Sequence, residues 1–226
     1  MAQLDVLFIR TAWKVSNELE NLVGVGKRES NEDHESERLR GPDRAKLAHL
    51  RKGLTTSDGW HPAVAVMLDQ WIPEDIREWD TPPFYQAASL FALHPESHER
   101  QPGEKYGPPF TVALHQYAQE QGQKSGRNLE DAKRPFDRRV MTLLNANEAD
   151  RFTHLRRLVH MLKGTDIQVD WCQLIIDLHY WDSPQRTVQR RWSRAWWPAP
   201  RWITPSDSDS TGASSNGPPL ANTTQE

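Results

Sequence analysis

The sequence from Arg134 to Trp197 reads RPFDRRVMTLLNANEADRFTHLRRLVHMLKGTDIQVDWCQLIIDLHYWDSPQRTVQRRWSRAWW. Apolar residues recur in it every three to four positions, which predicts three or four amphipathic helices. From Arg134 to Arg201 the chain carries 12 lysine and arginine residues against 7 acidic residues, although its formal net charge is −3. Positive charge is therefore concentrated in one helical region of the chain.

One of these helices is expected at residues 149–163. Three basic residues lie on one flank of its apolar stripe at helical spacing: Arg156, His160 and Lys163. Arg157 points away from that stripe. Gly164 follows directly and is typical of a helix end.

The next helix is expected at residues 171–181, with Asp170 as its N-cap. It is apolar on nearly every side, which predicts a buried central helix. The last helix is expected to begin at Asp182 or Ser183, with Pro184 in its first turn. Its outer side carries a row of arginines, Arg186, Arg190 and Arg194, with Arg191 at the edge.

Five further helices are predicted upstream, at residues 4–22, 42–53, 62–71, 82–93 and 110–122. Gly53 and Gly122 are expected to end two of them. Because no stretch alternates strictly between apolar and polar residues, strands are absent or incidental. The prediction is an all-α fold of about eight to nine helices in two small bundles. Residues 1–100 form the N-terminal bundle, residues 105–203 the basic C-terminal bundle, and residues 204–226 a disordered tail.

The composition indicates an intracellular, cytoplasmic protein. The chain has no apolar run of about 18 residues that could cross a membrane. Its first residues make a poor signal peptide, because an acidic residue precedes a short apolar run and no small-residue cleavage site follows. Cys172 is the only cysteine, so no internal disulfide or thiolate cluster can form.

No catalytic chemistry can be assigned to the sequence. The phosphate-loop, dinucleotide, serine-hydrolase and zinc-protease motifs are all missing. His94 and His98 lie four residues apart but have no obvious third ligand. Cys172 and His179 fall in the helix that is expected to be buried, where a thiol is a core residue. We therefore expect a protein that is not an enzyme and that has no cofactor and no metal.

The arginines on the outer helix faces are suited to bind a polyanion, because guanidinium groups pair bidentately with phosphates. The alternative is that they solvate the helices and pair with nearby carboxylates, Asp150, Asp177 and Asp182. The ten tryptophans could stack on bases. Their helical spacing instead assigns most of them to the core, and Trp197 and Trp202 are expected to be exposed.

Two runs of the sequence resemble a known family. They are RRVMTLLNANEADRFTHLRRLVHMLKGTDIQVDW at residues 138–171 and LHYWDSPQRTVQRRW at residues 178–192. The resemblance is to the CasB family, the small subunit of the type I-E CRISPR surveillance complex Cascade. The N-terminal segments RTAWKV and GPDRAKLAHLRKG also fit its pattern. The resemblance spans residues 5–197 and is loose between residues 55 and 125.

This resemblance implies an all-α subunit without catalytic activity, present as two copies in the complex. Its implied role in CRISPR antiviral defence is to bind the target strand and the displaced strand of the R-loop, while the guide RNA reads the sequence. The implied partners are the other Cascade proteins, the guide RNA and the target DNA, with no membrane. Phosphate contacts can position a strand without reading its sequence, which agrees with what arginines can do.

The residues to which the family's nucleic-acid-binding role is carried over form two sets. The first set consists of Arg51, Lys52, Arg138, Arg139, Arg156 and Arg157. The second set consists of Lys163, Arg186, Arg190 and Arg191. Relatives can be basic in the loop that joins the helix with Arg138 and Arg139 to the helix with Arg156 and Arg157. This chain instead has Asn145, Asn147, Glu148 and Asp150 in that loop. A strand contact at that loop is therefore not expected.

Two other functions remain open from the sequence. One is a free-standing DNA-binding regulator of the helix-turn-helix type. Against it, helix 171–181 is too apolar to enter a groove, and the last helix has few side chains that read base edges. The other is a protein-interaction scaffold whose arginines contact acidic proteins.

Overall fold

The computed structural model describes residues 2–24, 43–98 and 107–198. The helices in this part of the chain are α1 (Ala2–Asn21), α2 (Arg44–Leu50), η1 (Arg51–Thr55), α3 (Pro62–Leu68), η2 (Glu78–Asp80), α4 (Pro82–Phe91), α5 (Phe110–Ser125), α6 (Leu129–Leu144), α7 (Glu148–Leu162), α8 (Trp171–His179) and α9 (Thr187–Trp196). Within the same residues, the only strand-like pairing is an isolated parallel bridge between Ser97 and Val169. The predicted all-α fold is confirmed.

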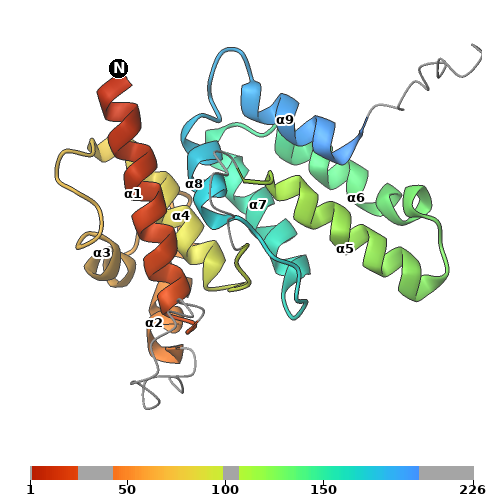
Figure 1. Cartoon of the computed structure of the whole chain (residues 1–226), viewed down its shortest axis with the longest axis horizontal. Helices are drawn as coiled ribbons and strands as arrows, with labels where there is room; N and C mark the ends of the chain where they lie inside the picture. The colour runs from red at the N-terminus through yellow and green to blue at the C-terminus, as the bar shows by residue number, and fades with distance from the viewer. Residues whose placement is uncertain (1, 25–42, 99–106, 199–226) are drawn as a thin grey trace, which may run out of the picture.

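The helices are spread along one long axis (Figure 1). α1 to α4 lie at one end, α5, α6 and α9 lie at the other end, and α7 and α8 lie between them. α8 packs against α1 and α4, whereas α5 packs against α6 and α9. The buried apolar side chains form one continuous core that includes residues of every α-helix. The division into bundles at residues 1–100 and 105–203 stays a prediction, and the tail at 204–226 lies outside the described residues.

α8 is the central helix, as its apolar sequence predicts. The Asp170 side chain accepts a hydrogen bond from the Gln173 backbone N–H at 2.6 Å and caps the helix. Every residue from Trp171 to Leu178 is buried. Of the tryptophans assigned to the core, Trp171, Trp181, Trp192 and Trp196 are almost fully buried.

The tryptophan at the end of α9 is less exposed than expected. Trp197 is half-buried, and its indole N–H donates to Asp137 Oδ1 at 3.1 Å. Trp202, the other tryptophan expected to be exposed, lies outside the described residues. Trp60 and Trp79, in contrast, are exposed by 47% and 72%, which the sequence did not indicate.

Two glycines that were expected to end helices have another role. The chain continues through Gly53 in η1, where an added Cβ would lie 2.2 Å from Ser89 Oγ of α4. α5 continues past Gly122 and ends at Ser125, before Gly126, whose φ of 66° is typical of a helix C-cap. At Gly122 an added Cβ would lie 3.0 Å from the Ala132 Cβ of α6. These glycines permit close helix packing, which no local pattern reveals.

The expected start of α9 at Asp182–Pro184 is also wrong. The helix begins at Thr187, after Arg186 with a positive φ of 50°. The backbone N–H of Arg186 donates to the Ser183 carbonyl at 2.8 Å, which closes a turn that contains Pro184. The Arg186 guanidinium donates to the Leu144 carbonyl of α6 at 2.6 Å and holds this turn against the neighbouring helix.

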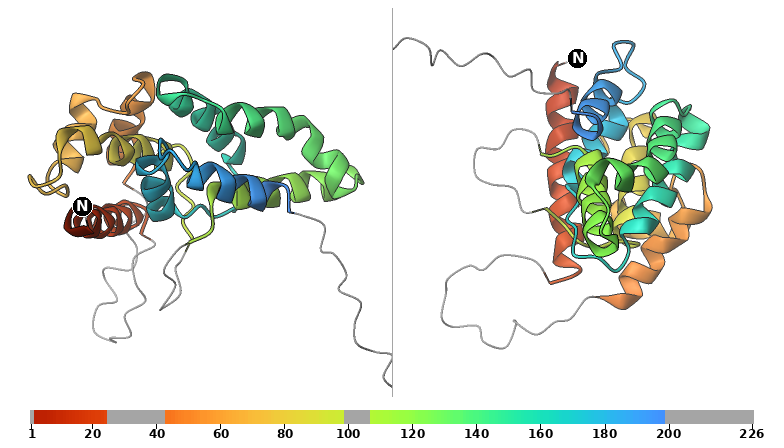
Figure 2. Two further views of the ribbon diagram at one scale, coloured as in Figure 1. Left: turned by 90° about the horizontal axis from the view of Figure 1, so that it is seen from above. Right: turned by 90° about the vertical axis from the view of Figure 1, so that its right-hand side faces the viewer.

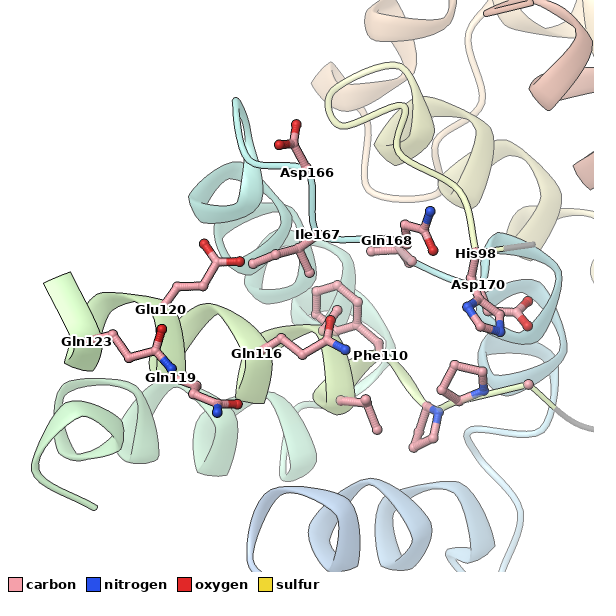
Figure 3. Close-up of a pocket in the computed structure, with 16 residues that line it drawn as sticks. His98, Phe110, Gln116, Gln119, Glu120, Gln123, Asp166, Ile167, Gln168 and Asp170 are labelled. Carbon is pink, nitrogen blue, oxygen red and sulfur yellow. The ribbon is translucent and has the colours of Figure 1, made fainter. Parts of the chain in front are cut away.

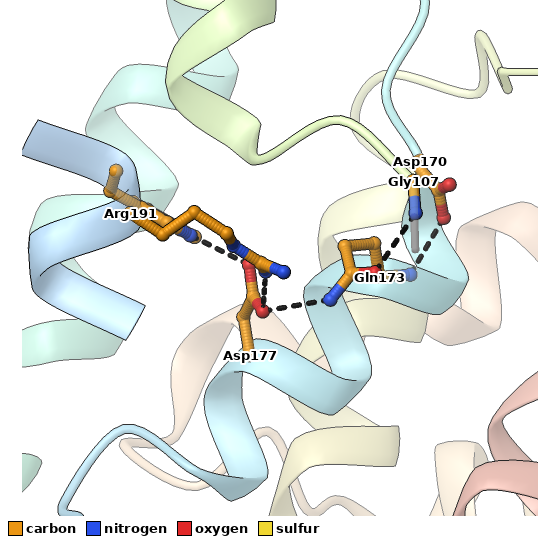
Figure 4. Close-up of polar contacts among 6 residues, drawn as sticks. Gly107, Asp170, Gln173, Asp177 and Arg191 are labelled. Atoms are coloured by element: carbon orange, nitrogen blue, oxygen red, sulfur yellow. Dashed lines mark hydrogen bonds and ion pairs between the residues drawn. The ribbon is translucent and has the colours of Figure 1, made fainter. Parts of the chain in front are cut away.

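A buried carboxylate joins α8 to α9 (Figure 4). Asp177 is ion-paired with Arg191, and it accepts hydrogen bonds from the Trp192 indole at 2.6 Å and the Gln173 amide at 2.9 Å. The Gln173 side chain also accepts a hydrogen bond from the Gly107 backbone N–H at 3.0 Å. Burial raises the pKa of Asp177, and the Arg191 charge and these hydrogen bonds oppose that rise.

His94, just after α4, forms a hydrogen bond with the segment that precedes α8. Its Nε2 lies 2.6 Å from the Ile167 carbonyl oxygen, and the side chain is buried. The adjacent bridge adds a hydrogen bond from the His98 N–H to the Val169 carbonyl at 3.0 Å. Burial lowers the pKa of His94, while the Ile167 hydrogen bond and the Glu96 charge act in the opposite direction.

We expect Asp177→Asn to lower the free energy of unfolding by about 2–4 kcal/mol, because Arg191 then loses its only anion in the described structure. Urea denaturation followed by circular dichroism measures the change. Glu120→Gln is the matched control, since Glu120 pairs with exposed Lys124 at 3.6 Å and such pairs contribute less than about 1 kcal/mol. Equal losses in the two variants would contradict the structural role of Asp177.

The stability of the protein is expected to fall as the pH is lowered below the ordinary His94 pKa of 6.5. The unfolded chain then binds a proton more readily than the buried imidazole does, so protonation favours unfolding. The unfolding midpoint should drop between pH 7.5 and pH 5.5. The drop should be smaller in His94→Gln, whose amide can still donate to Ile167, and unchanged in His160→Gln, whose side chain is exposed. An unchanged profile in His94→Gln would assign the pH dependence to other groups, such as His115.

Candidate nucleic-acid interface

The basic residues predicted to bind nucleic acid lie on η1, α6, α7 and α9 and on the residues that flank these helices. Five of them are exposed and, within the described part of the chain, form no side-chain hydrogen bond or ion pair: Lys52, Arg138, Arg157, Lys163 and Arg190. A cation that is exposed and unpaired needs no rearrangement before it contacts a phosphate. These five are therefore the best-suited members of the predicted set.

Arg156 brings two basic segments together that lie far apart in the sequence. Its guanidinium donates to the Leu54 carbonyl of η1, across a sequence separation of 102 residues. This bond places η1, with Arg51 and Lys52, beside the middle of α7, with Arg157. The expected flank of Arg156, His160 and Lys163 is therefore only partly available to a ligand. His160 and Lys163 are exposed, whereas Arg156 is half-buried.

Three further arginines use one donor each within the protein. Arg51 donates to the Ala92 carbonyl at 2.7 Å, and Arg186 to the Leu144 carbonyl at 2.6 Å. Arg139 donates to the sulfur of Met161 at 3.0 Å. A guanidinium has five N–H donors, so these exposed side chains keep donors for a phosphate. Their internal bonds fix the direction in which the guanidinium is presented.

Arg191 differs from the other predicted residues. It is half-buried and ion-paired with Asp177, whose side chain is 2% exposed. Turning Arg191 outward would leave a buried carboxylate without its counter-charge, at a cost of several kcal/mol. Its contribution to the structure is therefore packing α9 onto α8. Its neighbours Arg190 and Arg194 are exposed, as the helical spacing predicts.

The acidic and amide side chains between α6 and α7 stabilise the start of α7. Asn147 caps α7 by accepting a hydrogen bond from the Asp150 backbone N–H at 2.9 Å. Glu148 and Asp150 lie in the first turn, where negative charge is favoured by the helix dipole. Beside this loop is a hollow of about 610 Å³ whose lining includes Arg138, Met141 and His154.

A second cavity, of about 790 Å³, lies between α5 and residues 166–170 (Figure 3). The sequence did not indicate it. Among the described residues, its lining is rich in amide and acidic side chains and contains no lysine or arginine: these residues include Gln116, Gln119, Glu120, Gln123 and Asp166. The described part of this lining is therefore not suited to bind a phosphate. No group of three or more His, Cys, Asp or Glu residues in the described ranges could hold a metal ion.

No described helix combines the length and the apolar character needed to cross a bilayer.

Comparison with known proteins gives consistent matches. The family of CRISPR-associated protein Cse2 matches residues 46–197. A CRISPR-associated protein Cse2 from Thermus thermophilus is 28% identical over 156 residues, which are 69% of this chain and 80% of that protein. CasB from M. ruber has a similar structure, with a TM-score of 0.53 and 26% identity over 71% of this chain and 87% of that chain. A chain of a CRISPR RNA-guided surveillance complex shares the fold, with a TM-score of 0.56, 21% identity, and coverage of 84% and 93%.

Alanine substitutions on α7 should separate structural from surface arginines. Arg156→Ala removes the hydrogen bond to Leu54 and should lower the free energy of unfolding by about 1–1.5 kcal/mol. Arg157→Ala removes an exposed, unpaired side chain and should change it by less than about 0.5 kcal/mol. Thermal unfolding of both variants measures the difference. A larger loss for Arg157→Ala than for Arg156→Ala would contradict this assignment.

Proposed function

The chain belongs to the Cse2 family of CRISPR-associated proteins, and we propose that it is a non-catalytic subunit of an RNA-guided DNA surveillance complex. The similar fold of a chain from a CRISPR RNA-guided surveillance complex supports this role. The partners in such a complex are its other protein subunits, the guide RNA and the target DNA. A second copy of this chain is part of the same proposal.

Within that complex, the proposed activity is to hold the R-loop open by binding the phosphate backbone of the target strand and the displaced strand. The observation that carries this proposal is the set of exposed, unpaired cations on η1, α6, α7 and α9. Arg156 supports it, because its bond to Leu54 brings the basic residues of η1 and α7 together. R-loop formation is a nearly balanced exchange of strands, so a few backbone contacts are enough to favour the open form.

The positions of the basic residues favour backbone contacts over reading of the sequence. α8 is buried and cannot enter a groove of DNA. On α9, the only amide side chain, Gln189, is buried and donates to the Trp181 carbonyl at 2.7 Å. The remaining outer side chains of α9 are mostly arginines, which suit phosphates. A sequence-reading regulator of the helix-turn-helix type is therefore not favoured.

The proposed role predicts that the protein copurifies with guide RNA. A tagged full-length chain, expressed in its native host, is purified at low salt, and the bound RNA is sequenced. Repeat-derived guide RNA should be enriched over the RNA recovered with an unrelated tagged protein. Recovery of the chain with protein partners but without guide RNA, also at low salt, would favour the scaffold function instead.

Neutralising Lys52 and Arg157 together should weaken binding to a preformed R-loop without lowering protein stability. Each lost phosphate contact should reduce the slope of log affinity against log salt by about 0.7 to 0.9. Titration of a labelled R-loop at several salt concentrations measures both values. Lys124→Ala/Arg127→Ala is the matched control, because it removes the same charge from exposed residues at the α5–α6 turn. Equal weakening in both double variants would show that total charge, and not this site, determines binding.

A further inference from the structure

The segment Asp58–Asp80 exposes large apolar side chains on a surface that the proposed nucleic-acid contacts do not use. Trp60, Val66 and Trp79 are exposed by 47%, 80% and 72%. Among the described residues, only Val6 and Met141 are other large apolar side chains with comparable exposure. Three of five such residues therefore lie within one short segment. Large apolar side chains that are repeatedly exposed along one stretch of chain mark that stretch as a candidate interaction surface.

This segment lies at one end of the molecule. α3 and the chain that leads from it to α4 form the edge opposite to α5, α6 and the C-terminal end of α9 (Figure 1). The view from above in Figure 2 also places α3 and α6 on different sides of the central helices. A partner bound at this edge would therefore leave the basic surfaces of α6 and α9 open.

The same segment is strongly acidic. It carries one basic residue, Arg77, and six carboxylates, a net charge of −5: Asp58, Asp69, Glu74, Asp75, Glu78 and Asp80. Some of these are used within the protein, since Asp69 accepts a hydrogen bond from the Tyr85 hydroxyl at 2.5 Å and Asp80 pairs with Arg77 at 2.8 Å. Glu74, Asp75 and Glu78 are exposed and have no side-chain partner in the described structure.

A segment that exposes both indoles and free carboxylates is chemically matched to arginine. The protein itself contains one such contact, because the Arg77 guanidinium lies 5.2 Å from the centre of the Trp79 ring. Arginine stacks on aromatic rings and pairs with carboxylates at the same time. A surface with a charge of −5 repels phosphates, so nucleic acid and anionic lipid are disfavoured. Tryptophan and arginine are also the residues that contribute most to protein interfaces.

We propose that the segment Asp58–Asp80 is a docking surface for an arginine-bearing face of another protein subunit in the surveillance complex. This inference rests on the proposed function. A second copy of this chain could also offer arginines, but most of the exposed ones of α6, α7 and α9 are those that the proposed function assigns to phosphates. A different protein subunit is therefore the better-matched occupant.

The test places a photo-crosslinking residue, benzoylphenylalanine, at Val66 or at Trp79 of the tagged full-length chain. The control position is Met141, which is 51% exposed on α6. The complex is purified through the tag and irradiated, and the cross-linked peptides are identified by mass spectrometry. Both test positions should cross-link to one other protein of the complex, within an arginine-containing peptide of net positive charge, and Met141 should not. Cross-links to a second copy, to nucleic acid or to no component of the complex overturn the proposal.

A charge reversal makes the same test quantitative. Glu74→Lys/Asp75→Lys/Glu78→Lys changes three exposed residues without partners, so the unfolding midpoint should not change. The cross-link yield from Val66, or the amount of this chain in the complex, should fall by about tenfold or more. Glu148→Lys/Asp150→Lys/Asp166→Lys is the control of equal charge change, because it reverses three exposed carboxylates elsewhere. Its unfolding midpoint should fall, since Glu148 and Asp150 favour the start of α7, but its amount in the complex should not. An equal fall in both variants, or no fall in the first, contradicts the docking surface.

Guide RNA is measured in the same purified samples, which separates the two proposals. A wild-type complex that contains guide RNA but gives no cross-link from Val66 or Trp79 overturns only the docking surface. A cross-link to a basic protein in a sample without guide RNA overturns the proposed function and leaves the chemistry of the surface intact.

Discussion

The buried carboxylate of Asp177 is the interaction on which the arrangement of this protein depends. A carboxylate removed from water is unfavourable unless donors surround it, and three side chains supply them: Arg191, Trp192 and Gln173. Two of these donors belong to α9, and Gln173 also binds the backbone just before α5. Since α8 packs against α1 and α4 as well, the carboxylate connects the helices of one end of the molecule to those of the other.

This connection also determines which arginines of α9 face outward. Arg191 and Trp192 must turn toward Asp177, and residues of a helix are spaced by about 100°. Arg190 and Arg194 are therefore held on the exposed side. On α7, the Arg156 bond to Leu54 has a similar effect, because it fixes the side of the helix that meets η1 and leaves Arg157 exposed. In both helices one arginine is used for packing and its neighbour becomes available for a ligand.

Much of the fold could be predicted because its signals are local. The apolar residues and the Asp170 cap identify α8. Because this helix is apolar on nearly every side, its burial could also be predicted. What could not be predicted depends on contacts between distant residues. Gly53 and Gly122 are typical of helix ends but are needed for close packing against α4 and α6. The sequence likewise does not reveal that Arg156 meets Leu54, or that Trp60 and Trp79 are exposed although most tryptophans are core residues. For the candidate site, the sequence identifies the basic residues. Only the structure shows which of them are unpaired and which form hydrogen bonds or ion pairs within the protein.

The small net charge of −3 conceals two regions of opposite charge. The segment Asp58–Asp80 carries −5, whereas the region from Arg134 to Arg201 has a surplus of five positive charges. A polyanion is attracted by the basic region and repelled by the segment Asp58–Asp80, so the charge distribution itself orients the protein during an encounter. The repelled segment also exposes Val66 and Trp79, whereas η1 at the same end keeps the positive charges of Arg51 and Lys52. Protein contacts at that edge and backbone contacts at the basic helices are therefore compatible in one complex, because the surface that binds one partner is unfavourable for the other.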